Sequence, residues 1–184
     1  DPHLGNYSVF ESPVGTGQPS GINLLDYGCI RTFRPAFVEG VVDLYRGFLD
    51  NDPSRVERAY DSWGFKDLTA EQKAALDIWA RFIYGPLLDD RERTIADGTS
   101  PGEYGRREAF TVQKKLREAG RVLIPREFVF MDRAAIGLGG VFLHLDARQN
   151  WCRLFSDTIA DFDAGVVAAR QQAAFAAAGV PLPT

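Results

Sequence analysis

The chain has 184 residues, of which 45% are apolar and 25% are charged. This balance is that of a globular domain and argues against a disordered, collagenous or coiled-coil protein. Its 21 basic and 25 acidic residues give a net charge of −4, whereas a nucleic-acid-binding protein usually carries a basic excess. We therefore expect one folded unit and no nucleic acid as a partner.

The chain contains two cysteines, Cys29 and Cys152, and their separation fits neither a zinc motif nor a redox motif. Cys29 is expected to be a small buried apolar residue and not a reactive thiol. We therefore expect a reducing compartment and place the protein in the cytoplasm. The longest nearly apolar stretch, 134–145, is much shorter than the roughly 20 residues of a membrane-spanning helix, so none is predicted. The only methionine is Met131 and the first residue is Asp1, which predicts a segment of a longer chain.

Residues 1–33 differ in pattern from the rest of the chain. Two short apolar runs, 9–10 and 22–25, flank a stretch rich in glycine and proline at 11–21. Apolar runs separated by such a stretch are typical of two strands joined by a loose turn. The sequence therefore predicts a small β-hairpin.

From residue 34 onward the apolar residues recur at the three- and four-residue steps of helices. One helix is predicted behind Pro35, and a second behind Asp52-Pro53, with Gly64 at its end. Thr69 and Gln72 form the pattern of a capping box at the start of a third.

The second half of the chain is also predicted to be helical. After a loop at 97–105, helices are expected at 106–119 and 125–145, and one or two more at 150–178. Gly137-Leu138-Gly139-Gly140 falls inside a helical pattern with no strand before it. It therefore predicts close packing and not a phosphate-binding loop.

Polar residues stand at the two ends of the predicted hairpin where chemistry could occur. Asp1 and Asn6 lie five positions apart before the first strand, and Asp26-Tyr27-Gly28 follows the second. Two carboxylates and an amide oxygen brought together by a hairpin form a familiar arrangement for phosphoryl transfer.

These motifs resemble those of a known enzyme family. The spacing of Asp1 and Asn6 matches the kinase catalytic loop, and Asp26-Tyr27-Gly28 looks like the D-F-G metal-binding turn. The run 1–7 resembles the D-x-H-P-G-N loop of the UbiB/AarF-type atypical kinases, which are associated with ubiquinone biosynthesis. The run 24–29 is similar to the L-D-F-G segment of that family.

The resemblance is close over residues 1–65 and loose over the rest. The runs 49–53 and 63–65 look like the family's G-D-P and L-G-F positions. Leu4 stands where proline is usual and Tyr27 where phenylalanine is usual. Neither difference removes a metal-ligating atom.

The resemblance implies a protein-kinase-like fold, with the catalytic loop, hairpin and metal-binding turn in residues 1–33 and a mainly α-helical C-lobe in 34–184. It implies Asp1 as the catalytic aspartate, with Asn6 and Asp26 as ligands that hold magnesium and ATP. The N-terminal lobe would lie upstream, so this segment alone would be inactive. Quinone precursors, lipid or a membrane surface are the implied partners, with a peripheral membrane location as the alternative to the cytoplasm.

Two other functions fit the same residues. A phosphotransferase of the aminoglycoside or choline kinase type also carries Asp and Asn five apart, although Gly28 and the helices after it argue against that class. A catalytically silent kinase-like binding module is the third possibility. The retention of all three polar ligands argues against it.

Overall fold

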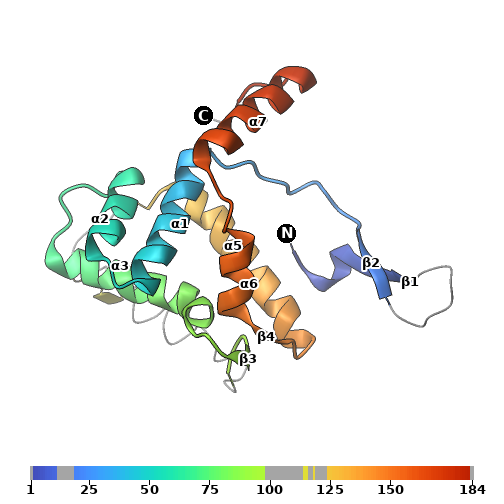
Figure 1. Cartoon of the computed structure of the whole chain (residues 1–184), viewed down its shortest axis with the longest axis horizontal. Helices are drawn as coiled ribbons and strands as arrows, with labels where there is room; N and C mark the ends of the chain where they lie inside the picture. The colour runs from blue at the N-terminus through green and yellow to red at the C-terminus, as the bar shows by residue number, and fades with distance from the viewer. Residues whose placement is uncertain (1, 12–18, 98–113, 116–117, 119–123, 183–184) are drawn as a thin grey trace.

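The computed structural model describes residues 2–11, 19–97, 114–115, 118 and 124–182. The described residues are mostly helical (61%) and include two small antiparallel sheets. The predicted mainly α-helical region with a small hairpin is thereby confirmed. Figure 1 shows most of the helices packed together, with the hairpin apart from them at the end of an extended segment.

The hairpin consists of β1 (Tyr7–Glu11) and β2 (Pro19–Leu24). The strands pair in antiparallel fashion, with Tyr7 opposite Leu24 and Phe10 opposite Gly21. A Cβ atom added at Gly21 would lie 2.5 Å from Cζ of Phe10, so the Phe10 ring lies over the glycine. The loop predicted between the strands lies largely outside the described residues.

The first three helices begin where the sequence predicts. They are α1 (Pro35–Leu49), α2 (Pro53–Ser62) and α3 (Ala70–Tyr84). The Asp52 carboxylate accepts a hydrogen bond from the Arg55 amide at 3.1 Å, which caps α2. Thr69 and Gln72 each accept a hydrogen bond from the other's backbone amide, as the capping box requires. Gly64 follows α2 with a φ of +84°, a conformation that favours glycine.

Helices α1 and α2 pack closely because two glycines of α1 leave room for α2. A Cβ atom at Gly40 would lie 2.6 Å from Nε1 of Trp63, and one at Gly47 would lie 2.9 Å from Cγ2 of Val56. The Trp63 indole also donates a hydrogen bond to the Phe37 carbonyl at 3.1 Å. The close approach of the two backbones and the hydrogen bond of the Trp63 indole thus stabilise the packing of α1 against α2.

The hydrophobic core is centred on an aromatic cluster. It receives Phe128 from α5 (Arg126–His144), which is 2% exposed. The Phe128 ring centroid lies 4.7 Å from that of Trp63, 5.1 Å from that of Phe37 and 5.3 Å from that of Trp79, all in edge-to-face geometry. Because such pairs add to the burial of apolar area, this cluster joins α5 firmly to α1 and α3.

The predicted helix at 125–145 is confirmed as α5, and the region 150–178 forms two helices. The remaining elements are η2 (Gly85–Leu88), β3 (Glu92–Thr94), β4 (Arg148–Asn150), α6 (Trp151–Thr158) and α7 (Ala164–Ala178). The predicted loop at 97–105 and helix at 106–119 lie almost wholly outside the described residues. Of the latter, Lys114, Lys115 and Glu118 are described and are helical.

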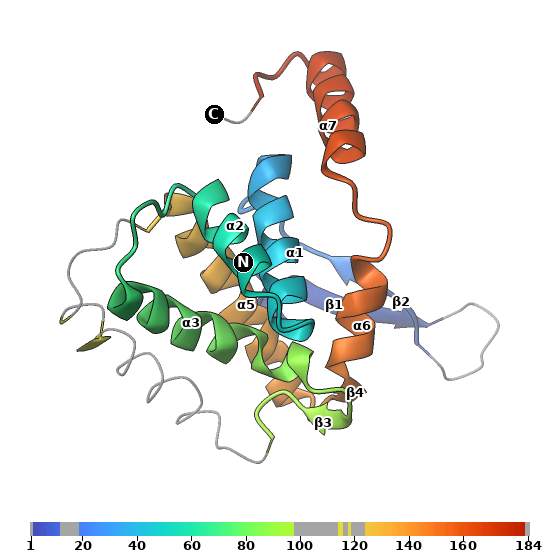
Figure 2. The ribbon, with the colours of Figure 1, turned by 60° about the vertical axis from the view of Figure 1, so that its left-hand side comes forward.

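The last helix, α7, stands away from the main helical body (Figure 2). It approaches the start of α1, where the Gln171 side chain donates a hydrogen bond to the Phe33 carbonyl at 3.0 Å. Among the described residues, no helix has the length and apolar character needed to cross a membrane.

Candidate functional site

The loop before β1 is shaped by His3. The side chain of His3 caps a short 3-10 turn, η1 (Leu4–Asn6), by accepting a hydrogen bond from the Gly5 amide at 3.1 Å. The Asn6 amide donates to the His3 carbonyl at 2.9 Å. His3 therefore shapes this loop. Asp1, the predicted catalytic residue, lies outside the described residues.

The turn after β2 is organised by Asp26. Its Oδ1 atom accepts a hydrogen bond from the Gly28 amide at 2.7 Å, which closes a tight Asx turn. A Cβ atom at Gly28 would lie 3.2 Å from the same oxygen, so glycine suits this position. Asp26 is exposed, and within the described part of the chain its Oδ2 atom accepts no hydrogen bond. That oxygen is available to a ligand.

The hairpin brings these two loops together. The Leu25 amide donates a hydrogen bond to the Asn6 carbonyl at 2.9 Å, which extends the β1–β2 pairing by one step beyond Tyr7 and Leu24. Asn6 and Asp26 thus stand at the same end of the hairpin, Asn6 just before β1 and Asp26 just after β2. The sequence places these residues 20 positions apart, and the strand register makes them neighbours.

The donor set suits a hard divalent cation. Asn6 supplies an amide oxygen and Asp26 a carboxylate, and Mg²⁺ commonly takes one or two such protein oxygens and completes its octahedron with phosphate and water. Among the residues that the structure describes, no group of three or more His, Cys, Asp or Glu side chains is placed to hold a metal ion. An amide and a carboxylate thus stand on either side of the hairpin base.

Two residues near the site differ from expectation or were missed. Sequence reasoning favours a buried Cys29, but its side chain is exposed because the segment after the turn runs outside the helical core. Arg31 was not predicted to have a role, yet its guanidinium lies 4.1 Å from the centre of the Phe130 ring on α5. A lone arginine in an extended segment gives no sequence signal of such a partner.

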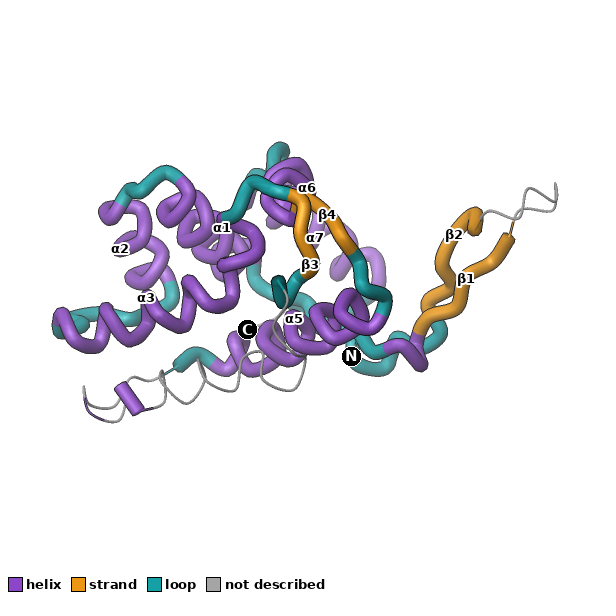
Figure 3. The backbone as a smooth tube through the Cα atoms, turned by 90° about the horizontal axis from the view of Figure 1, so that it is seen from below, coloured by secondary structure: helices purple, strands orange, loops and turns teal. Residues whose placement is uncertain are grey.

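The predicted close packing of Gly137 to Gly140 is found at one position only. A Cβ atom at Gly137 would lie 3.0 Å from the Pro2 carbonyl oxygen, whereas one at Gly139 or Gly140 would meet nothing within 4 Å. The neighbour is the N-terminal loop and not another helix. Figure 3 shows the N-terminal segment lying beside α5.

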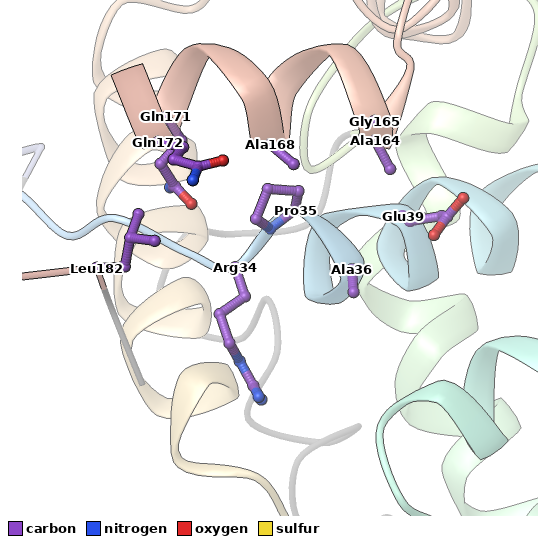
Figure 4. A pocket seen from close by; sticks show the side chains of 10 residues that line it. All are labelled: Arg34, Pro35, Ala36, Glu39, Ala164, Gly165, Ala168, Gln171, Gln172 and Leu182. Atoms are coloured by element: carbon purple, nitrogen blue, oxygen red, sulfur yellow. The ribbon is translucent and has the colours of Figure 1, made fainter. Parts of the chain in front are cut away.

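A cavity of about 500 Å³ lies elsewhere, between the first turn of α1 and α7 (Figure 4). Arg34 and Glu39 are its charged lining residues, and Leu182 closes one edge. None of its lining residues belongs to the loop before β1 or to the turn after β2. Asp26 instead lies on an open surface, whereas Asn6 is half-buried.

The comparisons with known proteins leave the family open. No protein-family model matches the chain, and neither a curated protein nor a solved structure matches it.

Proposed function

We propose that the chain is the C-lobe segment of an atypical kinase or ATPase of the UbiB/AarF type, which uses Mg-ATP in quinone or lipid metabolism. The observation that carries the proposal is the hydrogen bond between the Leu25 amide and the Asn6 carbonyl at 2.9 Å. It supports the proposal because it joins two motifs that resemble the catalytic loop and metal-binding turn of one enzyme family.

In this proposal each polar residue has one task. The Asn6 amide oxygen and the Asp26 carboxylate hold the cation against the ATP phosphates, and the hydrogen bond from Gly28 keeps the Asp26 carboxylate oriented. Bound Mg²⁺ supplies neutralisation of the charge that develops on the phosphates. Asp1 positions the attacking hydroxyl or water and accepts its proton.

The open surface around Asp26 fits a site that is completed by another part of the protein. In the family that the chain resembles, the nucleotide lies between two lobes, and the upstream lobe would carry the lysine that anchors the phosphates. We call the protein that contains this lobe together with residues 1–184 the parent protein. The present segment supplies half of its nucleotide site and is expected not to turn over ATP by itself.

The test is Mg²⁺-dependent binding and hydrolysis of ATP by the parent protein and by its Asp26→Asn variant. Asparagine keeps the Oδ1 atom that accepts from Gly28, so the turn is preserved while one ionic ligand is lost. We expect the Mg²⁺ concentration for half-maximal ATP binding, here called the Mg²⁺ requirement, to rise more than roughly tenfold. Loss of a residue that only supports a metal ligand already weakens metal binding by about that factor. Asp61→Asn, at an exposed position on α2, is the matched control.

Either result decides between function classes. Loss of Mg²⁺-dependent binding in Asp26→Asn but not in Asp61→Asn supports the enzyme. A parent protein that neither binds nor hydrolyses ATP, with or without quinone precursors and lipid, refutes the enzyme and favours a kinase-like binding module. Transfer of phosphate to a small alcohol or amine, without effect of quinone or lipid, would favour the small-molecule phosphotransferase.

A further inference from the structure

Helix α5 touches the loop before β1 at a glycine. A Cβ atom built on Gly137 would lie 3.0 Å from the carbonyl oxygen of Pro2 and 3.3 Å from its Cγ. The first distance is shorter than ordinary contacts of a Cβ atom, so any larger residue at 137 would displace the loop by a few tenths of an ångström. The loop that contains Asn6 thus rests against the backbone of α5.

The same helix also holds the segment after the metal-binding turn. The Arg31 guanidinium lies 4.1 Å from the centre of the Phe130 ring, which is a cation–π contact. Phe130 and Gly137 are seven residues apart, which places them on one face of the helix, roughly 10 Å apart along its axis. The two contacts therefore lie at successive positions along one side of α5.

The chain between these two contacts forms the hairpin and its flanking loops, which are joined to each other. Pro2 and Arg31 bracket the hairpin, and the hydrogen bond from the Leu25 amide to the Asn6 carbonyl closes its base. The apolar side chains of the hairpin are largely exposed, with Val9 69% and Ile22 64% exposed. Its strands therefore gain little stability from burial of their side chains. The contacts with α5 largely determine how the hairpin is oriented.

We propose that α5 supports the two loops that carry the metal-binding residues. Gly137 and Phe130 are the residues of α5 that position Asn6 and Asp26. The inference rests on the proposed function. It adds positioning residues that lie more than 100 residues downstream of the site in the sequence. Gly137 contacts Pro2, and Phe130 contacts Arg31. Each acts by fixing where the hairpin base stands relative to the helical core.

The first experiment compares Gly137→Ala with Gly140→Ala in the parent protein. Both substitutions make α5 more favourable as a helix, because alanine replaces glycine in its interior. Only the first puts a methyl group against Pro2. We expect Gly137→Ala to raise the Mg²⁺ concentration for half-maximal ATP binding on the order of tenfold, since small displacements of catalytic groups are costly. Gly140→Ala is expected to leave it unchanged.

A second pair of variants probes the other contact. Phe130→Leu removes the ring beneath Arg31, whereas Phe130→Tyr retains an aromatic face. We expect the leucine variant to raise the Mg²⁺ requirement and the tyrosine variant to restore the wild-type value. Thermal unfolding midpoints measured alongside identify any variant that fails to fold.

Hydrogen exchange provides a readout that does not depend on activity. The amides of Gly5 and Gly28 donate to His3 and Asp26 within the two loops, and their exchange reports the order of each loop. Faster exchange in Gly137→Ala than in Gly140→Ala, together with the altered Mg²⁺ requirement, supports the inference.

Equal Mg²⁺ requirements in Gly137→Ala and Gly140→Ala would overturn the inference while leaving the proposed function intact. Absence of Mg²⁺-dependent ATP binding in the wild-type parent protein would instead refute the proposed function, and the inference about its metal site with it.

Discussion

Replacing Asp132 by asparagine is expected to stabilise the protein at neutral pH and to lose this effect in acid. Asp132 lies on α5, and its Oδ1 atom is buried and has no hydrogen-bond partner among the residues that the structure describes. Burial disfavours the charged carboxylate and raises its pKa from 3.8 to about 6. The charge also raises the pKa of the buried Tyr84 hydroxyl, after the larger effect of that residue's own burial. The folded state therefore carries an unfavourable negative charge at pH 7.

The size of the effect follows from this pKa. A rise from 3.8 to about 6 corresponds to about 3 kcal/mol at roughly 1.4 kcal/mol per pH unit. Asp132 is only partly withdrawn from water, and solvent screening reduces the expected value to about 1–2 kcal/mol.

The sign is set by proton binding. Between the two pKa values the folded state binds more protons than the unfolded state, so its stability falls as pH rises. The stabilisation from a protonated Asp132 is fully present below about pH 4 and is lost as the pH rises through about 6. Asparagine cannot ionise and escapes this loss.

Denaturant unfolding of a protein containing residues 1–184 measures the difference. The free energy of unfolding of Asp132→Asn minus that of wild type should increase by about 1–2 kcal/mol between about pH 4 and about pH 7.5. Asp61→Asn, at an exposed position, should show no comparable change. A difference between Asp132→Asn and wild type that does not vary with pH would show that the Asp132 carboxyl is not destabilised by burial.

Three further substitutions test the helical core, each by denaturant unfolding. Gly40→Ala places a methyl group against Trp63 and should cost about 1–3 kcal/mol, reduced by a gain of about 1 kcal/mol in helix propensity; a net stabilisation would contradict the close packing. Tyr60→Phe removes the 2.7 Å hydrogen bond to Asp77 and should cost about 1.5 kcal/mol, an effect that should vanish in an Asp77→Ala background, where no side-chain acceptor remains. Thr69→Ala removes the helix cap and should cost about 1 kcal/mol, whereas Thr69→Ser should retain most of the stability.

The sequence predicts those parts of the fold whose causes are local. Pro35, Asp52 and Thr69 mark helix starts because each acts on amides within its own first turn. The hairpin is predictable for the same reason, since glycine and proline separate two apolar runs. These elements depend on neighbours that lie a few positions away in the chain.

The parts that sequence reasoning missed depend on distant partners. Strands β3 and β4 have three residues each and little strand propensity. They pair beside a group of ion pairs that includes Arg93 with Asp89 and Arg153 with Asp90, and the Trp151 indole donates to the Arg93 carbonyl at 2.8 Å. Separations of more than 50 residues leave no periodic signal in the sequence.

The candidate site was predicted in the same uneven way. The spacing of Asp1 and Asn6 and the run Asp26-Tyr27-Gly28 indicate the motifs in the sequence. The strand register brings Asn6 near Asp26. The proposed contact of α5 with the loop before β1 was not predictable, because Gly137 looked like one of three equivalent glycines in the sequence. Only the position of Pro2 distinguishes it from Gly139 and Gly140.

The two-stranded hairpin has a thermodynamic consequence for ligand binding at the proposed site. A sheet of two strands with exposed side chains is marginally stable in water, whereas the helices share an aromatic core. The hairpin can therefore open while the helices stay folded, and only the closed fraction of molecules presents Asn6 beside Asp26. The measured dissociation constant equals the intrinsic one divided by that fraction. Affinity at this site can thus be tuned by residues that change how often the hairpin is closed.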